Sequence, residues 1–191
     1  MSPAWNRKSS SHSRSSRIGN ASNLGTDLLA AFSLRSDGYE EEAEMPVLRG
    51  SCLCGGVKFE ISGPLIGPSN CHCSMCRKQH GAAFRSRARV QASDLKWVQG
   101  EDLVTFYESS PGTYRGFCRV CGSPIVNKFD ERSSSAKRDP AATSRLGIAL
   151  ATLDDDPGVR PDHHIFVANK AAWFEITDGM PQYPEGRLPM R

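Results

Sequence analysis

Hydrophobic residues in this chain recur in short alternating runs rather than in long periodic stretches. The clearest run, residues 57–61, alternates apolar and polar side chains with the period of two expected for a half-buried strand. Residues 104–107 and 165–168 are further short runs rich in residues that favour strands. No long segment repeats with the 3.6-residue period of an amphipathic helix. The pattern predicts strands and few, short helices.

Turn-forming groups of glycine and proline separate these runs. They occur at Gly55-Gly56, Gly63-Pro64, Gly67-Pro68, Ser110-Pro111-Gly112, Asp156-Pro157-Gly158 and Met180-Pro181. Each group interrupts the chain after a few residues, as expected for antiparallel strands that short turns connect. We therefore expect a mainly β domain built from antiparallel sheets.

The two ends of the chain differ from this middle part. Residues 1–23 are rich in serine and arginine without any acidic residue, and residues 40–44 are strongly acidic. We expect a disordered tail and linker over residues 1–46, a folded domain over residues 47–186 and a C-terminal tail over residues 187–191. The serine- and arginine-rich start also resembles a mitochondrial presequence, and a start site near Met45 is a further alternative.

Composition limits the classes of protein to consider. A chain of 191 residues with 38% hydrophobic content supports one domain with a modest core. The net charge is +3, and no stripe of lysine and arginine alternates with aromatic residues, so nucleic acid is not indicated. No segment has the roughly 18 to 20 apolar residues that cross a bilayer. Reduced thiols would place the protein in the cytoplasm, with the mitochondrion as the alternative.

The cysteines carry the strongest chemical signal. All seven fall into three clusters: Cys52 and Cys54; Cys71, Cys73 and Cys76; and Cys118 and Cys121. An odd count in a long chain does not favour disulfides, and cysteines that only fill space have no reason to recur at intervals of one or two residues. Zinc requires about four ligands, so this clustering indicates metal binding.

The spacing of the clusters suggests how they share metal ions. Cys52 with Cys54 and Cys118 with Cys121 each form a two-ligand turn followed by a glycine, and together they complete a four-thiolate structural zinc site. The remaining cluster, Cys71, Cys73 and Cys76, offers three thiolates and leaves one zinc position open for chemistry. His72 or His80 is the alternative fourth ligand, which would make this second zinc structural as well.

Four segments carry a family resemblance. They are GSCLCGGVKFEI from Gly50, CHCSMCRKQHGAAF from Cys71, YESSPGTYRGFCRVCGSP from Tyr107 and LDDDPGVRPDHHIFVANKAAWFEITDGMPQY from Leu153. Together they resemble the glutathione-dependent formaldehyde-activating enzyme family, also called the centromere-protein-V family, over about residues 47–186. The resemblance implies an Mss4-like, β-tent fold and two zinc ions.

The resemblance also implies the same division of ligands. Cys52, Cys54, Cys118 and Cys121 would hold the structural zinc, and Cys71, Cys73 and Cys76 the catalytic zinc. The chain departs from the family pattern at Ala172, where proline is common, and at residues 131–144, where many members are shorter. We expect residues 131–144 to form a polar surface loop.

The family's activity suggests a reaction for this chain. It joins formaldehyde to glutathione as S-(hydroxymethyl)glutathione, which in reverse is a carbon–sulfur lyase reaction. We therefore expect a zinc-dependent lyase with glutathione as co-substrate and a small aldehyde as its partner. Three thiolates donate much charge and leave zinc a weak Lewis acid, so binding of the glutathione sulfur is the expected use of the open position.

Glutathione carries two carboxylates, so basic side chains should lie near the three-cysteine cluster. Arg77 is the expected anchor, because guanidinium binds carboxylate through two parallel hydrogen bonds. Further candidates are Lys78, Arg115, Lys170 and His164, and ordinary surface charge is the alternative for each. We expect the apolar side chains of Trp173, Phe174, Phe166 and Ile165 in the core, and Asp154, Asp155 and Asp156 in a solvent-exposed turn.

Two other classes of function are compatible with the sequence. The centromere-linked members suggest a non-catalytic zinc module whose tail binds a partner, and three exposed thiolates suit a redox or metal-handling protein. Residue order leaves the aldehyde and the oligomeric state open.

Overall fold

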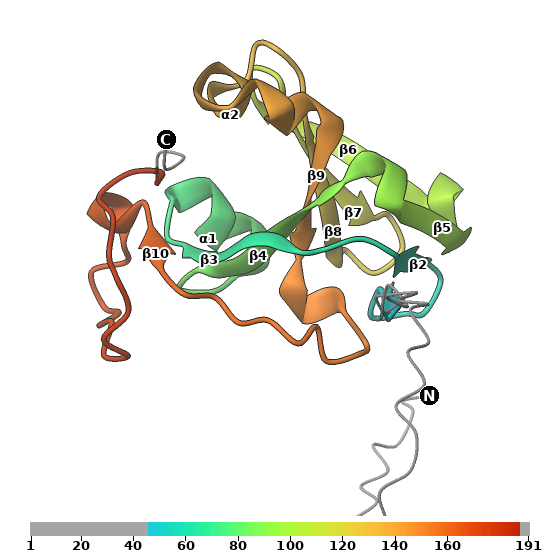
Figure 1. The fold of residues 1–191 in the computed structure, drawn as a ribbon, viewed down its shortest axis with the longest axis horizontal. Coiled ribbons are helices and arrows are strands. Elements are labelled where there is room, and N and C mark those ends of the chain that lie inside the picture. Colours follow the sequence, from blue (N-terminus) through green and yellow to red (C-terminus); the bar gives the residue numbers. More distant parts are fainter. Residues whose placement is uncertain (1–45, 188–191) are drawn as a thin grey trace, which may run out of the picture. The chain divides into compact units, whose positions relative to one another are not determined.

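The computed structural model describes residues 46–187 (Figure 1). They belong to one compact unit of the chain, which spans Glu42–Arg191. The expected N-terminal tail, its alternative as a presequence and most of the expected C-terminal tail lie outside the described residues. No helix in the described part is both long and apolar enough to cross a membrane.

The described residues form two sheets that are antiparallel apart from one strand pair. A three-stranded sheet has the order β1 (Leu48–Ser51), β2 (Lys58–Ile61) and β5 (Leu95–Gln99). A seven-stranded sheet has the order β10 (His164–Ile165), β3 (Ile66–Cys71), β4 (Arg85–Gln91), β9 (Arg145–Ala149), β8 (Pro124–Phe129), β7 (Thr113–Cys118) and β6 (Val104–Ser110). The mainly β prediction is confirmed.

The helices in this part of the chain are short, as expected. They are α1 (Ser74–His80) and α2 (Ser134–Arg138), with the 3₁₀ turns η1 (Ala92–Asp94), η2 (Glu101–Leu103), η3 (Pro140–Ser144), η4 (Leu150–Thr152) and η5 (Val167–Asn169). Helix α1 directly follows β3, so the three-cysteine cluster spans the end of a strand and the first turn of a helix (Figure 1).

The prediction of a surface loop over residues 131–144 is wrong, because this segment forms α2 and η3. The side chain of Ser133 caps α2 by accepting a hydrogen bond from the amide of Ala136 at 3.0 Å. Asp139 accepts from the amide of Ala141 at 3.2 Å at the start of η3. Ser133, Ala136 and Ala142 are buried, so local capping and packing order a stretch whose polarity suggests a loop.

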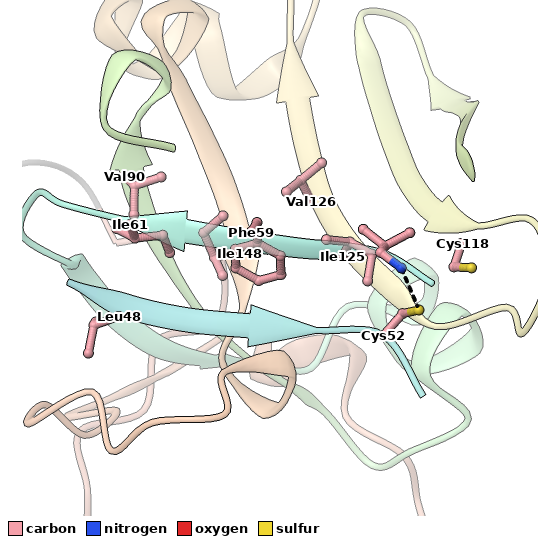
Figure 2. Packing of buried hydrophobic residues seen from close by; sticks show 10 residues of the cluster. Leu48, Cys52, Phe59, Ile61, Val90, Cys118, Ile125, Val126 and Ile148 are labelled. Carbon is pink, nitrogen blue, oxygen red and sulfur yellow. Dashed lines mark hydrogen bonds between the residues drawn. The ribbon is translucent and has the colours of Figure 1, made fainter. Parts of the chain in front are cut away.

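The main hydrophobic core joins the two sheets. Figure 2 shows Phe59 and Ile61 of β2 beside Val126 of β8 and Ile148 of β9, all of them buried. The alternation predicted over residues 57–61 is confirmed, because Val57, Phe59 and Ile61 are buried while Lys58 is exposed. Full burial of such a side chain contributes about 1.5–3 kcal/mol.

The apolar run at residues 165–168 forms less strand than predicted. Only Ile165 belongs to a strand, the two-residue β10, and η5 follows at once. β10 pairs in parallel with the end of β3, where Ile165 lies opposite Cys71. Residues 163–166 therefore lie beside the three-cysteine cluster, although about 90 residues of sequence separate the two segments.

Candidate metal centres and active site

The structure brings Cys52, Cys54, Cys118 and Cys121 together. Their Sγ atoms all lie within 4.8 Å of one another. The Sγ atoms of Cys52 and Cys54 are 3.4 Å apart, and those of Cys54 and Cys118 are 3.9 Å apart. Tetrahedral zinc with bonds of about 2.3 Å places its sulfurs roughly 3.8 Å apart, so these four thiols fit one zinc ion. We call them the four-thiol group.

Two similar turns build this group. The amide of Gly55 donates to the carbonyl of Cys52 at 2.9 Å, and the amide of Gly122 donates to the carbonyl of Cys118 at 2.8 Å. Both glycines have positive φ, 71° and 75°, which lets the backbone fold back around the sulfurs. One turn follows β1 and the other connects β7 to β8, so the group joins the two sheets.

The thiols are also placed to act as ligands. The amide of Val57 donates to the Sγ of Cys52 at 3.2 Å, the contact dashed in Figure 2. Such a hydrogen bond favours the thiolate form over the thiol. The hydroxyl of Ser123 accepts from the amide of Leu53 at 3.0 Å and thereby links the two turns directly.

Cys71, Cys73 and Cys76 form a second group, which we call the tripod. Their Sγ atoms lie within 4.8 Å of one another. Cys71 ends β3, Cys73 is the N-cap of α1, and Cys76 lies in its first turn. The amide of Cys76 donates to the Sγ of Cys73 at 3.3 Å. Helix capping therefore points the thiol of Cys73 at the same centre as its two neighbours.

The tripod has the electrostatics of a cation site. Hydrogen bonds from Cys71 and Cys73, together with the charges of Arg85 and Arg115, lower the pKa of the Cys76 thiol. The neighbouring thiols Cys73 and Cys76 raise the pKa of Cys71. The opposite shifts arise because three thiolates so close together repel one another. A divalent cation removes that repulsion, and all seven cysteines are free rather than paired in disulfides.

Neither His72 nor His80 joins the tripod. Among residues 46–187, the ligand atoms that cluster there are the three sulfurs alone. His72 is fully buried, and its Nε2 shares a hydrogen bond of 2.7 Å with Nδ1 of His164. His164 is 1% exposed and bonds to Asp178 at 2.9 Å through Nε2, so it is a buried linking residue rather than a surface cation. A three-ligand arrangement stays the better prediction.

A cavity of about 410 Å³ adjoins the tripod, and arginine dominates its lining. The three tripod cysteines line it together with Arg85, Arg87, Arg89, Arg115, Arg138, Arg145 and Arg187. Within the described part of the chain, Asp139 is the one acidic side chain in the lining. The cavity is therefore strongly cationic and suits an anionic ligand.

Two of these arginines lie beside the tripod. Arg115 is 6% exposed, and its Nη1 lies 3.8 Å from the Sγ of Cys76 and donates to the side chain of Gln79 at 2.6 Å. Arg85 is 3% exposed and donates to the carbonyl of Gly147 at 3.1 Å. Burial lowers the pKa of Arg85 to about 10, which still leaves it charged at neutral pH.

Other sequence candidates lie elsewhere. Arg77 is not among the residues that line the cavity, and its Nε donates to the carbonyl of His72 at 3.3 Å. Lys78 is exposed, and the ammonium of Lys170 donates to the carbonyl of Phe174 at 2.7 Å. The expectation that Trp173 belongs to the core is wrong, because its side chain is 75% exposed.

Sequence reasoning missed the arginines of β4. Arg85, Arg87 and Arg89 alternate along the strand, while Ala88 and Val90 on the opposite face are fully buried. The period of two was visible in the sequence and would have placed the three guanidinium groups on one face. Arginine taken one residue at a time suggests an ordinary surface position.

His163 was also missed. It lines the cavity, is 6% exposed, and its Nδ1 pairs with the carboxylate of Asp162. Because Asp162 engages Nδ1, Nε2 is the ring nitrogen that can exchange a proton with a ligand in the cavity. The sequence shows two adjacent histidines after an aspartate, and only the fold distinguishes the one that lines the cavity from the one that is buried behind it.

Phe166 has an unusual backbone conformation next to the tripod. Its φ is 57°, which makes it the one residue other than glycine with positive φ in the described range. Its amide donates to the carbonyl of Glu185 at 3.1 Å, and its side chain packs against the buried cluster that Cys71, Cys76 and Ile165 form. Left-handed backbone in a bulky residue persists only where the surroundings enforce it, as they often do at ligand sites.

This backbone conformation predicts that glycine at position 166 gives a more stable protein than alanine, the reverse of the usual order. Phe166→Gly should be more stable than Phe166→Ala by about 1 kcal/mol, because only glycine adopts positive φ without strain. Both variants lose the same ring, so their difference reports the backbone alone. At Phe174, whose φ is not positive, the alanine variant should be the more stable one. Urea unfolding of the four variants measures this, and equal stability of the two Phe166 variants would contradict it.

Comparisons with known proteins identify the family of this chain. The family model described as glutathione-dependent formaldehyde-activating enzyme matches residues 47–169. A relative from Halomonas elongata, whose name assigns it provisionally to that activity, is 32% identical over 138 residues, or 68% of this chain and 81% of the relative. A crystal structure of a Rhodobacter sphaeroides protein is 25% identical with a TM-score of 0.45, over 59% of this chain and 97% of that one. This chain belongs to the glutathione-dependent formaldehyde-activating enzyme family.

Proposed function

We propose that this protein is a zinc-dependent carbon–sulfur lyase that forms or cleaves the adduct of glutathione with a small aldehyde. The observation that carries the proposal is the position of the tripod, whose three cysteines line an arginine-rich cavity. Membership of the family supports glutathione and formaldehyde as the substrate classes.

The proposed reaction balances without a further reactant. In the forming direction the glutathione thiol releases its proton to solvent, and the sulfur attacks the carbonyl carbon of the aldehyde. A carbon–sulfur bond forms while the π electrons of the carbonyl pass to oxygen. The resulting alkoxide takes up one proton to give the hydroxymethyl group, and cleavage follows the same steps in reverse.

The tripod and its two neighbouring arginines suit a sulfur anion. Zinc held by Cys71, Cys73 and Cys76 would supply a fourth position at which the glutathione sulfur stays a thiolate. The buried guanidinium groups of Arg85 and Arg115 add two positive charges beside that position. They stabilise both the thiolate and the alkoxide, because charges interact more strongly away from water.

His163 is the proposed proton carrier. Its Nδ1 is held by Asp162, which leaves Nε2 to donate a proton to the alkoxide and to remove it in the reverse direction. His163→Gln should lower the catalysed rate by about 10²-fold, the lower end of what proton transfer contributes. Binding of S-methylglutathione, which undergoes no proton transfer, should stay within about twofold of the wild type when measured by calorimetry. A variant with the wild-type rate would remove His163 from the proposal.

Exchange spectroscopy at equilibrium tests the reaction itself. Formaldehyde labelled with ¹³C interconverts with its glutathione adduct without a catalyst, so the measured quantity is the exchange rate above that background. The zinc-loaded protein should accelerate exchange, and the same assay with other aldehydes identifies the preferred electrophile. Tight binding of two zinc ions without acceleration for any aldehyde would favour the non-catalytic zinc module instead.

A further inference from the structure

Three arginines gather in the cavity on the side of α2 and β9. Arg89 of β4 and Arg145 of β9 both contact the Oδ2 atom of Asp139, at 3.3 and 3.0 Å. Arg138, the last residue of α2, lines the same cavity, and its guanidinium lies 5.7 Å from the centre of the Phe166 ring. We call Arg89, Arg138 and Arg145 the distal arginine cluster.

Two hydrogen-bond donors in this cluster have no acceptor among the described residues. The Nε atoms of Arg89 and Arg145 are buried and have no partner among the described residues. Asp139 accepts from other donors instead: its Oδ2 bridges the Nη1 atoms of both arginines, and its Oδ1 caps η3 at the amide of Ala141. A buried donor without a partner is unfavourable, so a bound acceptor would stabilise this end of the cavity.

The net charge of the distal arginine cluster also favours binding of an anion. The cluster holds three guanidinium groups, two of them paired with the carboxylate of Asp139, which leaves a net charge of about +2. Burial, followed by the charge of the adjacent Arg87, lowers the pKa of Arg89 to about 10. The cations are thus crowded together, and an anion would relieve their repulsion.

We propose that the distal arginine cluster is a carboxylate-binding subsite that holds the glycyl end of the thiol substrate; this rests on the proposed function. The two ends of glutathione differ in charge. The γ-glutamyl end carries an ammonium beside its carboxylate and is neutral overall, whereas the glycyl end is a lone carboxylate. A cationic cluster without a free acidic group selects the glycyl end.

The distance between the tripod and the distal arginine cluster is compatible with the length of the cysteinyl-glycine half of glutathione. Arg85 lies beside the tripod, and Arg89 lies four residues further along the same strand and on the same face, about 13 Å away at 3.3 Å per residue. From the sulfur, the cysteinyl-glycine half of glutathione extends over up to about 7 Å. Arginine side chains that reach into the cavity cover the rest of that separation.

Calorimetric binding of S-methylglutathione to the zinc-loaded full chain tests the subsite. This probe keeps both carboxylates but has no thiol to ionise, so its affinity does not depend on catalysis. The wild type should bind it at least about tenfold more tightly than its glycine ethyl ester, as expected for loss of charge-assisted hydrogen bonds. Arg145→Gln should weaken binding of the acid about tenfold and leave binding of the ester unchanged.

Two further variants separate the subsite from a general effect of charge. Arg138→Gln should weaken acid binding about threefold, and because Arg138 is exposed this change leaves the fold intact. Arg119→Gln removes an exposed arginine that lies near Asp102 and does not line the cavity, so it should bind both probes like the wild type. If Arg145→Gln and Arg138→Gln bind the acid like the wild type, or if acid and ester bind wild type equally, the subsite proposal is overturned.

The failures of the two proposals are distinguishable. Accelerated formaldehyde exchange without any preference for the acid probe retains the lyase and overturns the subsite. The expected acid preference, lost in Arg145→Gln, supports the subsite even if the protein accelerates no exchange. In that case the lyase proposal fails, and the cavity binds a carboxylate-bearing peptide for another purpose.

Discussion

Replacing Cys118 with serine should remove one of two zinc ions and lower the melting temperature by at least about 10 °C. Cys118 is fully buried where the four-thiol group joins the two sheets. Structural zinc contributes about 10–16 kcal/mol in small zinc-finger peptides, and a domain with its own core should still lose about 5 kcal/mol. At roughly 2–4 °C per kcal/mol for a chain of this size, the shift is large. Elemental analysis and thermal unfolding measure the two effects.

Cys73→Ser is the matched control for this result. Serine is a good N-cap residue, so α1 should keep its first turn, and the four-thiol group is untouched. This variant should lose the other zinc ion with a much smaller change in melting temperature. Two bound zinc ions and a wild-type melting temperature in Cys118→Ser would mean that the four-thiol group is not a structural metal site.

Cys73→Ser should also abolish catalysis. The variant loses one of the three thiolates of the tripod, and with it the zinc ion that would offer a position to the glutathione sulfur. We expect the catalysed exchange rate to fall by at least about 10³-fold, which corresponds to about 4 kcal/mol of transition-state stabilisation. The measurement is ¹³C exchange between formaldehyde and its glutathione adduct, corrected for the uncatalysed rate.

A neighbouring substitution controls for disturbance of the helix. Ser74→Ala changes an exposed side chain at the first position of α1 and leaves all three thiols in place, so it should keep the wild-type rate. Full activity in Cys73→Ser, with only one zinc bound, would show that the reaction takes place away from the tripod.

The parts of the fold that follow from local patterns could be predicted. Alternation over residues 57–61 places Phe59 and Ile61 in the core, and glycines after Cys54 and Cys121 identify the turns with positive φ. The pairing of the two-cysteine clusters across more than 60 residues was also accessible, because each turn offers two ligands and zinc requires about four.

The parts that depend on distant contacts could not be predicted. β10 is two residues long and has no periodicity, so its parallel pairing with β3 is invisible in sequence. That pairing places His163 at the cavity and buries His164 against His72. Trp173 is a comparable case, because its apolar side chain suggests a core position while the chain leaves it exposed beside Phe174.

Strand β4 has a consequence for the accuracy of folding. Its two faces have opposite character: Ala88 and Val90 pack in the apolar core, while Arg85, Arg87 and Arg89 line the cavity. A slip of one residue against β9 would turn three guanidinium groups into that core and expose the apolar side chains. Such a mispaired chain is too unfavourable to persist. The arginines of β4 therefore also fix the register of β4 against β9, because only one alignment of the two strands keeps their side chains out of the core.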